Sequence, residues 1–90
     1  MSEIIRAVQI TNKRGLHARA SAKLVTLASS QPVPLMVEKA GSRVTATSIM
    51  GLMMLGAAMG DTITISADGD GAETAVRALV ELVEDRFGED

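Results

Sequence analysis

Residues 15–22 read Gly-Leu-His-Ala-Arg-Ala-Ser-Ala and include His17, the only histidine of the chain. An alanine-rich, helix-compatible stretch begins directly after it, so the imidazole is expected where a loop becomes a helix. Arg19 follows two residues later. A neutral ring nitrogen, the unpaired N–H groups of a helix start and a fixed cation together make a compact site for phosphate.

His17 has few competitors as a nucleophile, because the chain contains no cysteine and no tyrosine. An unperturbed histidine is largely neutral at pH 7, so a ring nitrogen is free to attack phosphorus. A lone histidine can also simply cap a helix or lie exposed in a loop. A cation near a helix start opposes the helix dipole, so Arg19 suits anion binding better than helix stability. Lys13 and Arg14 fit an ordinary polar loop that could add to the positive field.

Composition excludes several other functions. A chain of 90 residues predicts one domain, spanning 1–90, and a hydrophobic content of 47% favours a folded core. A net charge of −2, no basic stripe and a single aromatic residue argue against nucleic-acid binding. One histidine without cysteine cannot form a zinc cluster, and we expect no metal and no bound cofactor. No apolar run reaches membrane-spanning length, which predicts a cytoplasmic protein without membrane insertion.

Hydrophobic periodicity predicts the elements that must position these side chains. Alternation of apolar and polar residues predicts strands over 4–11, 33–38, 43–46 and 61–67. Helical spacing predicts helices over 18–28 and 49–55. A last helix, with capping-box spacing between Asp70 and Glu73, is expected to run to about Arg86. Its inward residues are expected to be Ala72, Ala75, Val76, Leu79 and Val83.

The predicted order is therefore βαββαβα, with alternating rather than continuously apolar strands. This pattern favours an α+β open-faced sandwich: a four-stranded antiparallel sheet with three helices on one face and solvent on the other. Pro32 and Pro34 place the second strand either at a sheet edge or just after the strand entrance.

The second helix carries more large apolar side chains than a core can accept. Leu52 and Leu55 are expected to point inward, whereas Ile49, Met50 and Met53 are expected to contribute to an exposed docking surface, since methionine adapts to several partners. Ser48 precedes this helix and should cap it, a contribution of ~1 kcal/mol. A phosphate at Ser48 would also be favoured by the helix dipole, so capping and regulatory phosphorylation are compatible.

Three blocks of the sequence resemble the HPr family, the histidine phosphocarriers of the bacterial phosphotransferase system. Residues 13–22 are similar to its active-site signature, 47–56 to its regulatory-serine region and 60–69 to its fourth strand. The resemblance implies that enzyme I, with phosphoenolpyruvate, phosphorylates Nδ1 of His17, assisted by Arg19. His17 would then pass the phosphoryl group to an enzyme IIA-type acceptor, for sugar uptake or regulation. An HPr kinase/phosphorylase acting on Ser48 and a monomeric state are further expectations.

Two positions depart from the family pattern, and alternatives to the reading remain. Ala20 stands where the family usually has proline, and Thr47 where lysine is common. Such a protein is a carrier of phosphoryl groups rather than a turnover enzyme. One alternative is a purely regulatory, nitrogen-branch carrier without sugar transport. Another is a small α/β binding module whose histidine is incidental.

Overall fold

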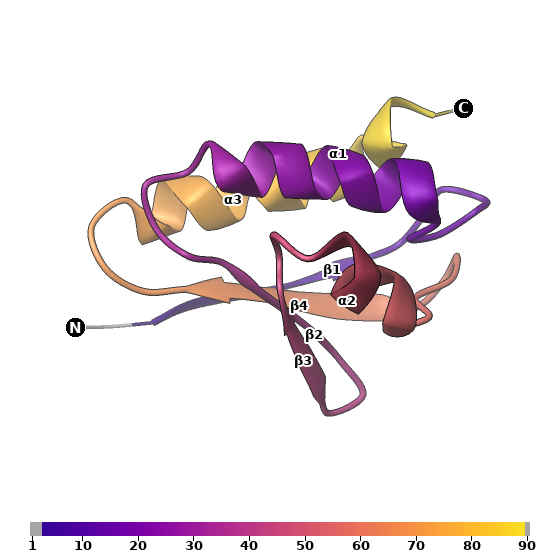
Figure 1. Cartoon of the computed structure of the whole chain (residues 1–90), viewed down its shortest axis with the longest axis horizontal. Helices are drawn as coiled ribbons and strands as arrows, with labels where there is room; N and C mark the ends of the chain where they lie inside the picture. Colours follow the sequence, from indigo (N-terminus) through magenta and orange to yellow (C-terminus); the bar gives the residue numbers. More distant parts are fainter. Residues whose placement is uncertain (1–2, 90) are drawn as a thin grey trace.

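The computed structural model describes residues 3–89, and residues 1, 2 and 90 of the predicted domain lie outside this range. Its elements follow the expected order, with one short 3₁₀ helix added at the end (Figure 1). The elements are β1 (Ile4–Gln9), α1 (Ala18–Ser29), β2 (Met36–Lys39), β3 (Ser42–Thr45), α2 (Ile49–Met54), β4 (Thr62–Ala67), α3 (Ala72–Glu84) and η1 (Arg86–Gly88).

The four strands form one antiparallel sheet in the order β1-β4-β2-β3. Strand β4 is central and pairs Ile65 with Val37 of β2. Helices α1 and α3 lie along the same side of this sheet, and α2 packs against α1 and β3 (Figure 1). The predicted open-faced sandwich, with three helices and four antiparallel strands, is thus confirmed.

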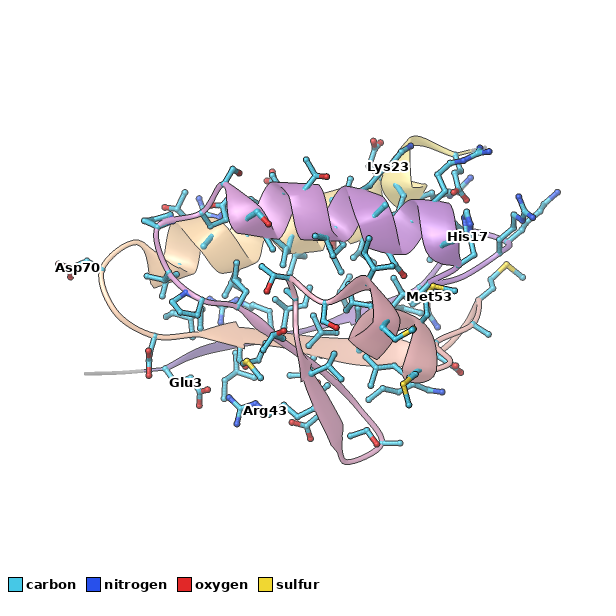
Figure 2. All side chains as sticks on the ribbon, viewed as in Figure 1. Glu3, His17, Lys23, Arg43, Met53 and Asp70 are labelled. Carbon is cyan, nitrogen blue, oxygen red and sulfur yellow. The ribbon has the colours of Figure 1, made fainter. Side chains whose placement is uncertain are left out.

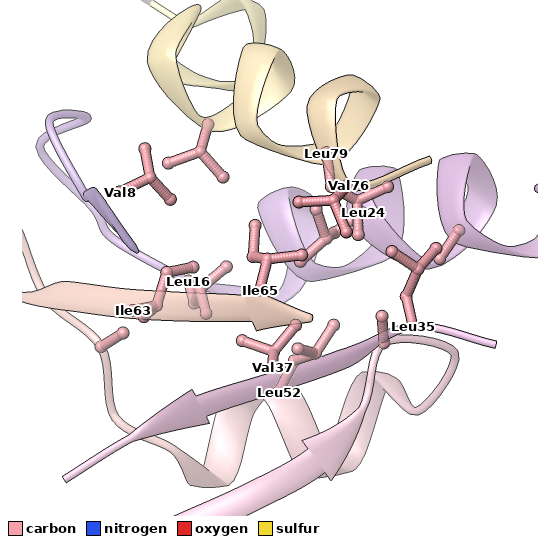
Figure 3. Close-up of a cluster of buried hydrophobic side chains, with 14 of the residues drawn as sticks. Val8, Leu16, Leu24, Leu35, Val37, Leu52, Ile63, Ile65, Val76 and Leu79 are labelled. Atoms are coloured by element: carbon pink, nitrogen blue, oxygen red, sulfur yellow. The ribbon is translucent and has the colours of Figure 1, made fainter. Parts of the chain in front are cut away.

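A single cluster of aliphatic side chains fills the space between sheet and helices (Figure 3). Ile63 and Ile65 of β4 are fully buried, as their alternation predicts. The five residues expected on the inner side of α3 are all buried. Leu24 contributes from α1 and Leu52 from α2, so all three helices contribute side chains to the same core.

The second strand and the last helix start differ from the sequence prediction. Strand β2 begins at Met36 rather than residue 33, because the preceding prolines cannot donate hydrogen bonds to a neighbouring strand. Because β2 is an inner strand of the sheet, the prolines mark the entrance of the strand and not a sheet edge. The capping box before α3 is wrong. Gly71 is the N-cap with φ 88°, in the left-handed region, and no side chain caps the helix.

Candidate phosphate site at the start of helix α1

The loop before α1 is held down so that His17 stands at its rim. Leu16 is buried, and its N–H donates to Ala57 O at 2.9 Å while its carbonyl accepts from Ser21 Oγ at 3.1 Å. Gly15 has φ 63°, and a Cβ there would lie 2.4 Å from Ala57 O. Only glycine permits this close approach. Leu16, which precedes His17, is therefore held through both its N–H and its carbonyl.

His17 is the N-cap residue of α1, with extended backbone, and its carbonyl accepts from Ser21 N–H at 2.9 Å. Within residues 3–89, the N–H groups of Ala18, Arg19 and Ala20 have no hydrogen-bond partner. These groups and the helix dipole favour an anion at this point. The sequence prediction that the imidazole lies where loop becomes helix is confirmed.

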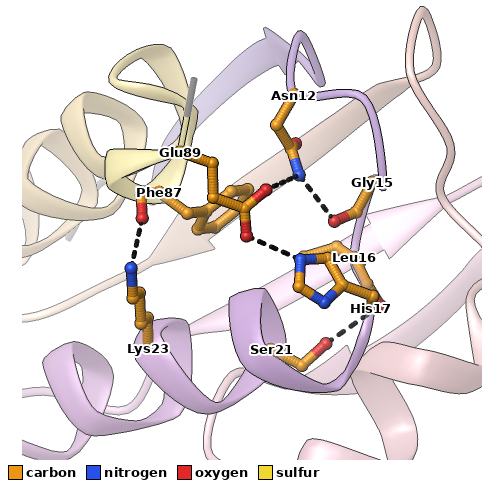
Figure 4. A network of polar contacts seen from close by, with 8 residues as sticks. All are labelled: Asn12, Gly15, Leu16, His17, Ser21, Lys23, Phe87 and Glu89. Atoms are coloured by element: carbon orange, nitrogen blue, oxygen red, sulfur yellow. Dashed lines mark hydrogen bonds and ion pairs between the residues drawn. The ribbon is translucent and has the colours of Figure 1, made fainter.

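The chain end returns to the histidine (Figure 4). Nε2 of His17 lies 2.6 Å from Oε2 of Glu89, which is 72 residues away in the chain. The other oxygen of Glu89 accepts from Asn12 Nδ2 at 3.1 Å, and the same Nδ2 donates to Gly15 O at 2.9 Å. The hydrogen bond with His17, opposed by desolvation, holds the pKa of the Glu89 carboxyl below its usual 4.5, and the Asn12 bond helps.

Asn12 is a buried polar residue, only 1% exposed, and its amide orientation is determined by its neighbours. The two partners of Nδ2 are both acceptors, so the reversed amide would place Oδ1 against two oxygens. Its Oδ1 has no partner among the described residues. A buried acceptor without a partner lowers the stability of the fold. Asn12 is nevertheless buried in this way, and its Nδ2 links the loop before α1 to Glu89.

Arg19 belongs to a basic hollow next to His17. The hollow has a volume of about 380 Å³ and is lined by Lys13, Arg14, Arg19, Lys23, Gly88 and Glu89. Four of the nine basic residues of the chain meet here, so the local field is positive although the net charge is −2. Arg19 is exposed and forms no ion pair within residues 3–89.

Helix α2 and its cap carry the other predicted site residues, and Met53 of this helix lies at the same end of the molecule as His17 (Figure 2). Ser48 Oγ accepts from Gly51 N–H at 2.9 Å, so the predicted cap is confirmed. Ile49, Met50 and Met53 are exposed by 43%, 72% and 43%, whereas Leu52 is fully buried. Met54, exposed by 80%, extends the same apolar surface and was not predicted. No helix among residues 3–89 is long and apolar enough to cross a bilayer.

Glu89, Asn12 and Lys23 were missed by reasoning from the sequence. Asn12 and Glu89 lie in stretches whose local pattern is that of an ordinary polar segment, and Lys23 lies within the predicted helix over 18–28. The one available signal was Phe87, because a single aromatic residue near the chain end indicates a packed rather than a loose tail. Phe87 is indeed buried, 1% exposed.

An α+β open-faced sandwich that holds one imidazole at a helix start, beside a hollow of cations, defines a class of small proteins able to bind a phosphoryl group. Comparison with known families specifies the class further. The family model described as "PTS HPr component phosphorylation site" matches residues 4–85. The chain belongs to the HPr family and is a phosphocarrier of the phosphotransferase system.

Known relatives agree with this assignment. The phosphocarrier protein HPr of Cupriavidus necator is 48% identical over 84 residues, covering 93% of this chain and 94% of that protein. The phosphocarrier protein NPr of Shewanella violacea is 40% identical over 89 residues, covering 99% of this chain and 98% of that protein. The crystal structure of HPr-C-His from Thermoanaerobacter tengcongensis has a TM-score of 0.89 at 46% identity, covering 100% and 99%. An HPr-type carrier is thus better supported than the nitrogen-branch alternative. The partners that the family implies are phosphotransferase components such as enzyme I and IIA-type proteins.

Proposed function

We propose that His17 is the phosphoryl acceptor and donor of this phosphocarrier and that the group is held on Nδ1. The observation that carries the proposal is the position of the imidazole at the start of α1, where three backbone N–H groups lack partners. A phosphohistidine carries about two negative charges, and these N–H groups can donate hydrogen bonds to its phosphoryl oxygens.

Arg19 is proposed to bind the oxygens of the transferred group. It lies on the first turn of α1, in the basic hollow beside His17, and no carboxylate within residues 3–89 occupies its guanidinium. A planar guanidinium can bind two phosphoryl oxygens at once. Lys13, Arg14 and Lys23 add to the positive field, which lowers the energy of the transition state as charge spreads over those oxygens.

Incubation with enzyme I and phosphoenolpyruvate tests both roles. We expect one acid-labile phosphoryl group in the wild-type chain and none in His17→Ala. Labelling that persists in His17→Ala would refute the assignment. Arg19→Ala should fold normally, within about ±0.5 kcal/mol of wild type, and transfer more slowly. Transfer by Arg19→Ala at the wild-type rate would remove Arg19 from the site.

The exposed apolar surface of α2, formed by Ile49, Met50, Met53 and Met54, is proposed as the docking surface shared by enzyme I and IIA-type acceptors. Its Met53 lies at the His17 end of the molecule, and α2 packs directly on α1. A phosphate on Ser48, placed by an HPr kinase/phosphorylase, would add charge next to this surface. The helix start that Ser48 caps through Gly51 N–H also accommodates the phosphate, so the expected loss of docking comes from charge repulsion and desolvation at the apolar surface.

Titration calorimetry against enzyme I can test this surface. Met50→Glu and Ser48→Asp should both weaken binding while circular dichroism shows an intact fold. Ile5→Glu is the matched control, because Ile5 is 52% exposed on β1, on the sheet face opposite to buried Val8. Unchanged affinity in Met50→Glu and Ser48→Asp would mean that the partners dock elsewhere.

The cellular setting and the assembly state are part of the same proposal. We expect a cytoplasmic protein that supplies both transport and regulatory acceptors. We also expect a monomer, because the aliphatic core is closed within one copy of the described chain. Sedimentation equilibrium should return a mass close to 9.4 kDa. A mass twice as large, independent of concentration, would contradict the monomer.

A further inference from the structure

We propose that Glu89 is a positioning residue for His17: its carboxylate keeps the ring proton on Nε2, so that Nδ1 retains the lone pair that attacks phosphorus. This inference rests on the proposed role of His17 as the phosphoryl acceptor. It adds a residue from the opposite end of the chain to the transfer reaction and assigns it a defined task.

The geometry leaves the Glu89 carboxylate little freedom. One oxygen lies 2.6 Å from His17 Nε2 and the other 3.1 Å from Asn12 Nδ2, so rotating the group would break both contacts. The His17 and Glu89 side chains are only 18% and 17% exposed, which limits competition from water. Figure 4 shows the carboxylate between the amide and the imidazole, with the second ring nitrogen pointing away from it.

The direction of the hydrogen bond follows from the chemistry of the partners. The pKa of Glu89 is held below its usual range, chiefly by His17, so the group is an anion near neutral pH. An ionised carboxylate can only accept hydrogen bonds. Nε2 must therefore be the donor, and in the neutral ring the proton cannot also be on Nδ1. The contact thus selects the tautomer that exposes Nδ1 as a nucleophile.

The segment that carries Glu89 is fixed to the body of the protein. Phe87 is buried in the core, and its carbonyl accepts from Lys23 Nζ of α1 at 2.6 Å. Arg86 and Phe87 both have φ 56°, a left-handed conformation that non-glycine residues rarely adopt. Such a conformation persists where surrounding contacts enforce it. These contacts bring Glu89 back over the start of α1.

The transfer step can be balanced with this arrangement. The Nδ1 lone pair forms the N–P bond while the bond from phosphorus to the donor group breaks and its electrons leave with that group. No proton has to leave the ring, because Nε2–H remains and the ring becomes an imidazolium. Glu89 stabilises that positive charge, as a carboxylate does for the histidine of a catalytic triad. In the forward transfer to an acceptor, the N–P electrons return to Nδ1 and the neutral ring is restored.

Nuclear magnetic resonance of the unphosphorylated, ¹⁵N-labelled chain tests the contact independently of any transfer. Wild type should show a hydrogen-bonded Nε2–H proton and an unprotonated Nδ1. Glu89→Gln keeps an acceptor oxygen and should retain this pattern, whereas Glu89→Ala should lose the proton signal. Glu84→Ala is the matched control, because Glu84 is exposed and its side chain forms no hydrogen bond or ion pair within residues 3–89. A proton on Nδ1 in wild type, or an unchanged spectrum in Glu89→Ala, would overturn the proposal.

Kinetics of phosphorylation by enzyme I then tests the consequence. Glu89→Ala should lower the maximal rate about tenfold, the typical effect of losing one charged hydrogen bond, while the half-saturating concentration stays unchanged. Glu89→Gln should recover part of the loss, and Glu84→Ala should match wild type. A wild-type rate in Glu89→Ala would refute the positioning role and leave His17 as acceptor. Absence of phosphorylation in wild type would refute the proposed function, and the spectra would still decide the contact.

Discussion

Truncation of the only aromatic side chain, Phe87→Ala, tests whether the chain end is a structural part of the domain. Phe87 is 1% exposed and packs in the aliphatic core. Removing a buried phenyl ring costs about 3–5 kcal/mol, and the lower value applies here because a chain end can move to fill the space. For a domain of this size each kcal/mol lowers Tm by about 4–8 °C, so we expect a fall of about 12–24 °C.

Urea unfolding followed by circular dichroism measures this loss, since the chain has no tryptophan or tyrosine for fluorescence. Phe87→Leu keeps an apolar side chain of similar volume and should lose less than half as much. Met54→Ala removes a side chain that is 80% exposed and should change stability by less than about 0.5 kcal/mol. If Phe87→Ala loses less than about 1 kcal/mol, the tail is not anchored by its ring and the reasoning fails.

Three further changes test the supports of the site and sheet. Ser48→Ala removes the oxygen that accepts from Gly51 N–H and should cost about 1 kcal/mol by urea unfolding, whereas Ser48→Asp, which keeps an acceptor, should cost less. Gly15→Ala forces a Cβ against Ala57 O in a left-handed conformation, so it should destabilise by about 1–3 kcal/mol and broaden the amide resonance of His17; an unaffected fold would contradict the close approach. The pKa of Asp61 is lowered, first by Ala58 N–H and then by Lys39, so its stabilising contribution is present above the unfolded value of 3.8 and is lost as pH falls through the lowered folded value. The stability gap between wild type and Asp61→Ala should therefore be open at neutral pH and close in strong acid, and a gap independent of pH would refute this linkage.

Where local periodicity controls structure, the sequence was sufficient. The five apolar residues of α3 recur at helical spacing, and a helix lying on a sheet has only one way to bury them. The position of His17 at a helix start followed from an alanine-rich stretch after a glycine loop. The Ser48 cap followed in the same way from a hydroxyl before an apolar helix.

Where two local signals compete, the sequence was misleading. Asp70 and Glu73 have the spacing of a capping box, but the intervening Gly71 adopts a left-handed conformation that places the chain against Pro32. Leu35 alternates with its neighbours as a strand residue should, but Pro34 before it delays the regular ladder to Met36. In each case a backbone restriction of one residue overrides the side-chain pattern around it.

The hollow of Lys13, Arg14, Arg19 and Lys23 was predicted from the sequence only in part, because Lys23 was missed. Two of its cations come from the loop before α1 and two from successive turns of that helix, so no stretch of the chain is basic enough to stand out. Glu89 lines the hollow because the tail that carries it packs on α1.

The site thus combines two opposing electrostatic demands. In the proposed transfer, the hollow would attract the phosphoryl oxygens. Glu89 lines the same hollow and interacts with Lys23, but its contact with the ring is at Nε2, where its negative charge would stabilise the imidazolium. A carboxylate placed on the Nδ1 side would repel the incoming group. Nε2 of the His17 ring points towards Glu89, and Nδ1 points away from it. In the proposed reaction, this orientation would let a negative residue assist the transfer of a negative group.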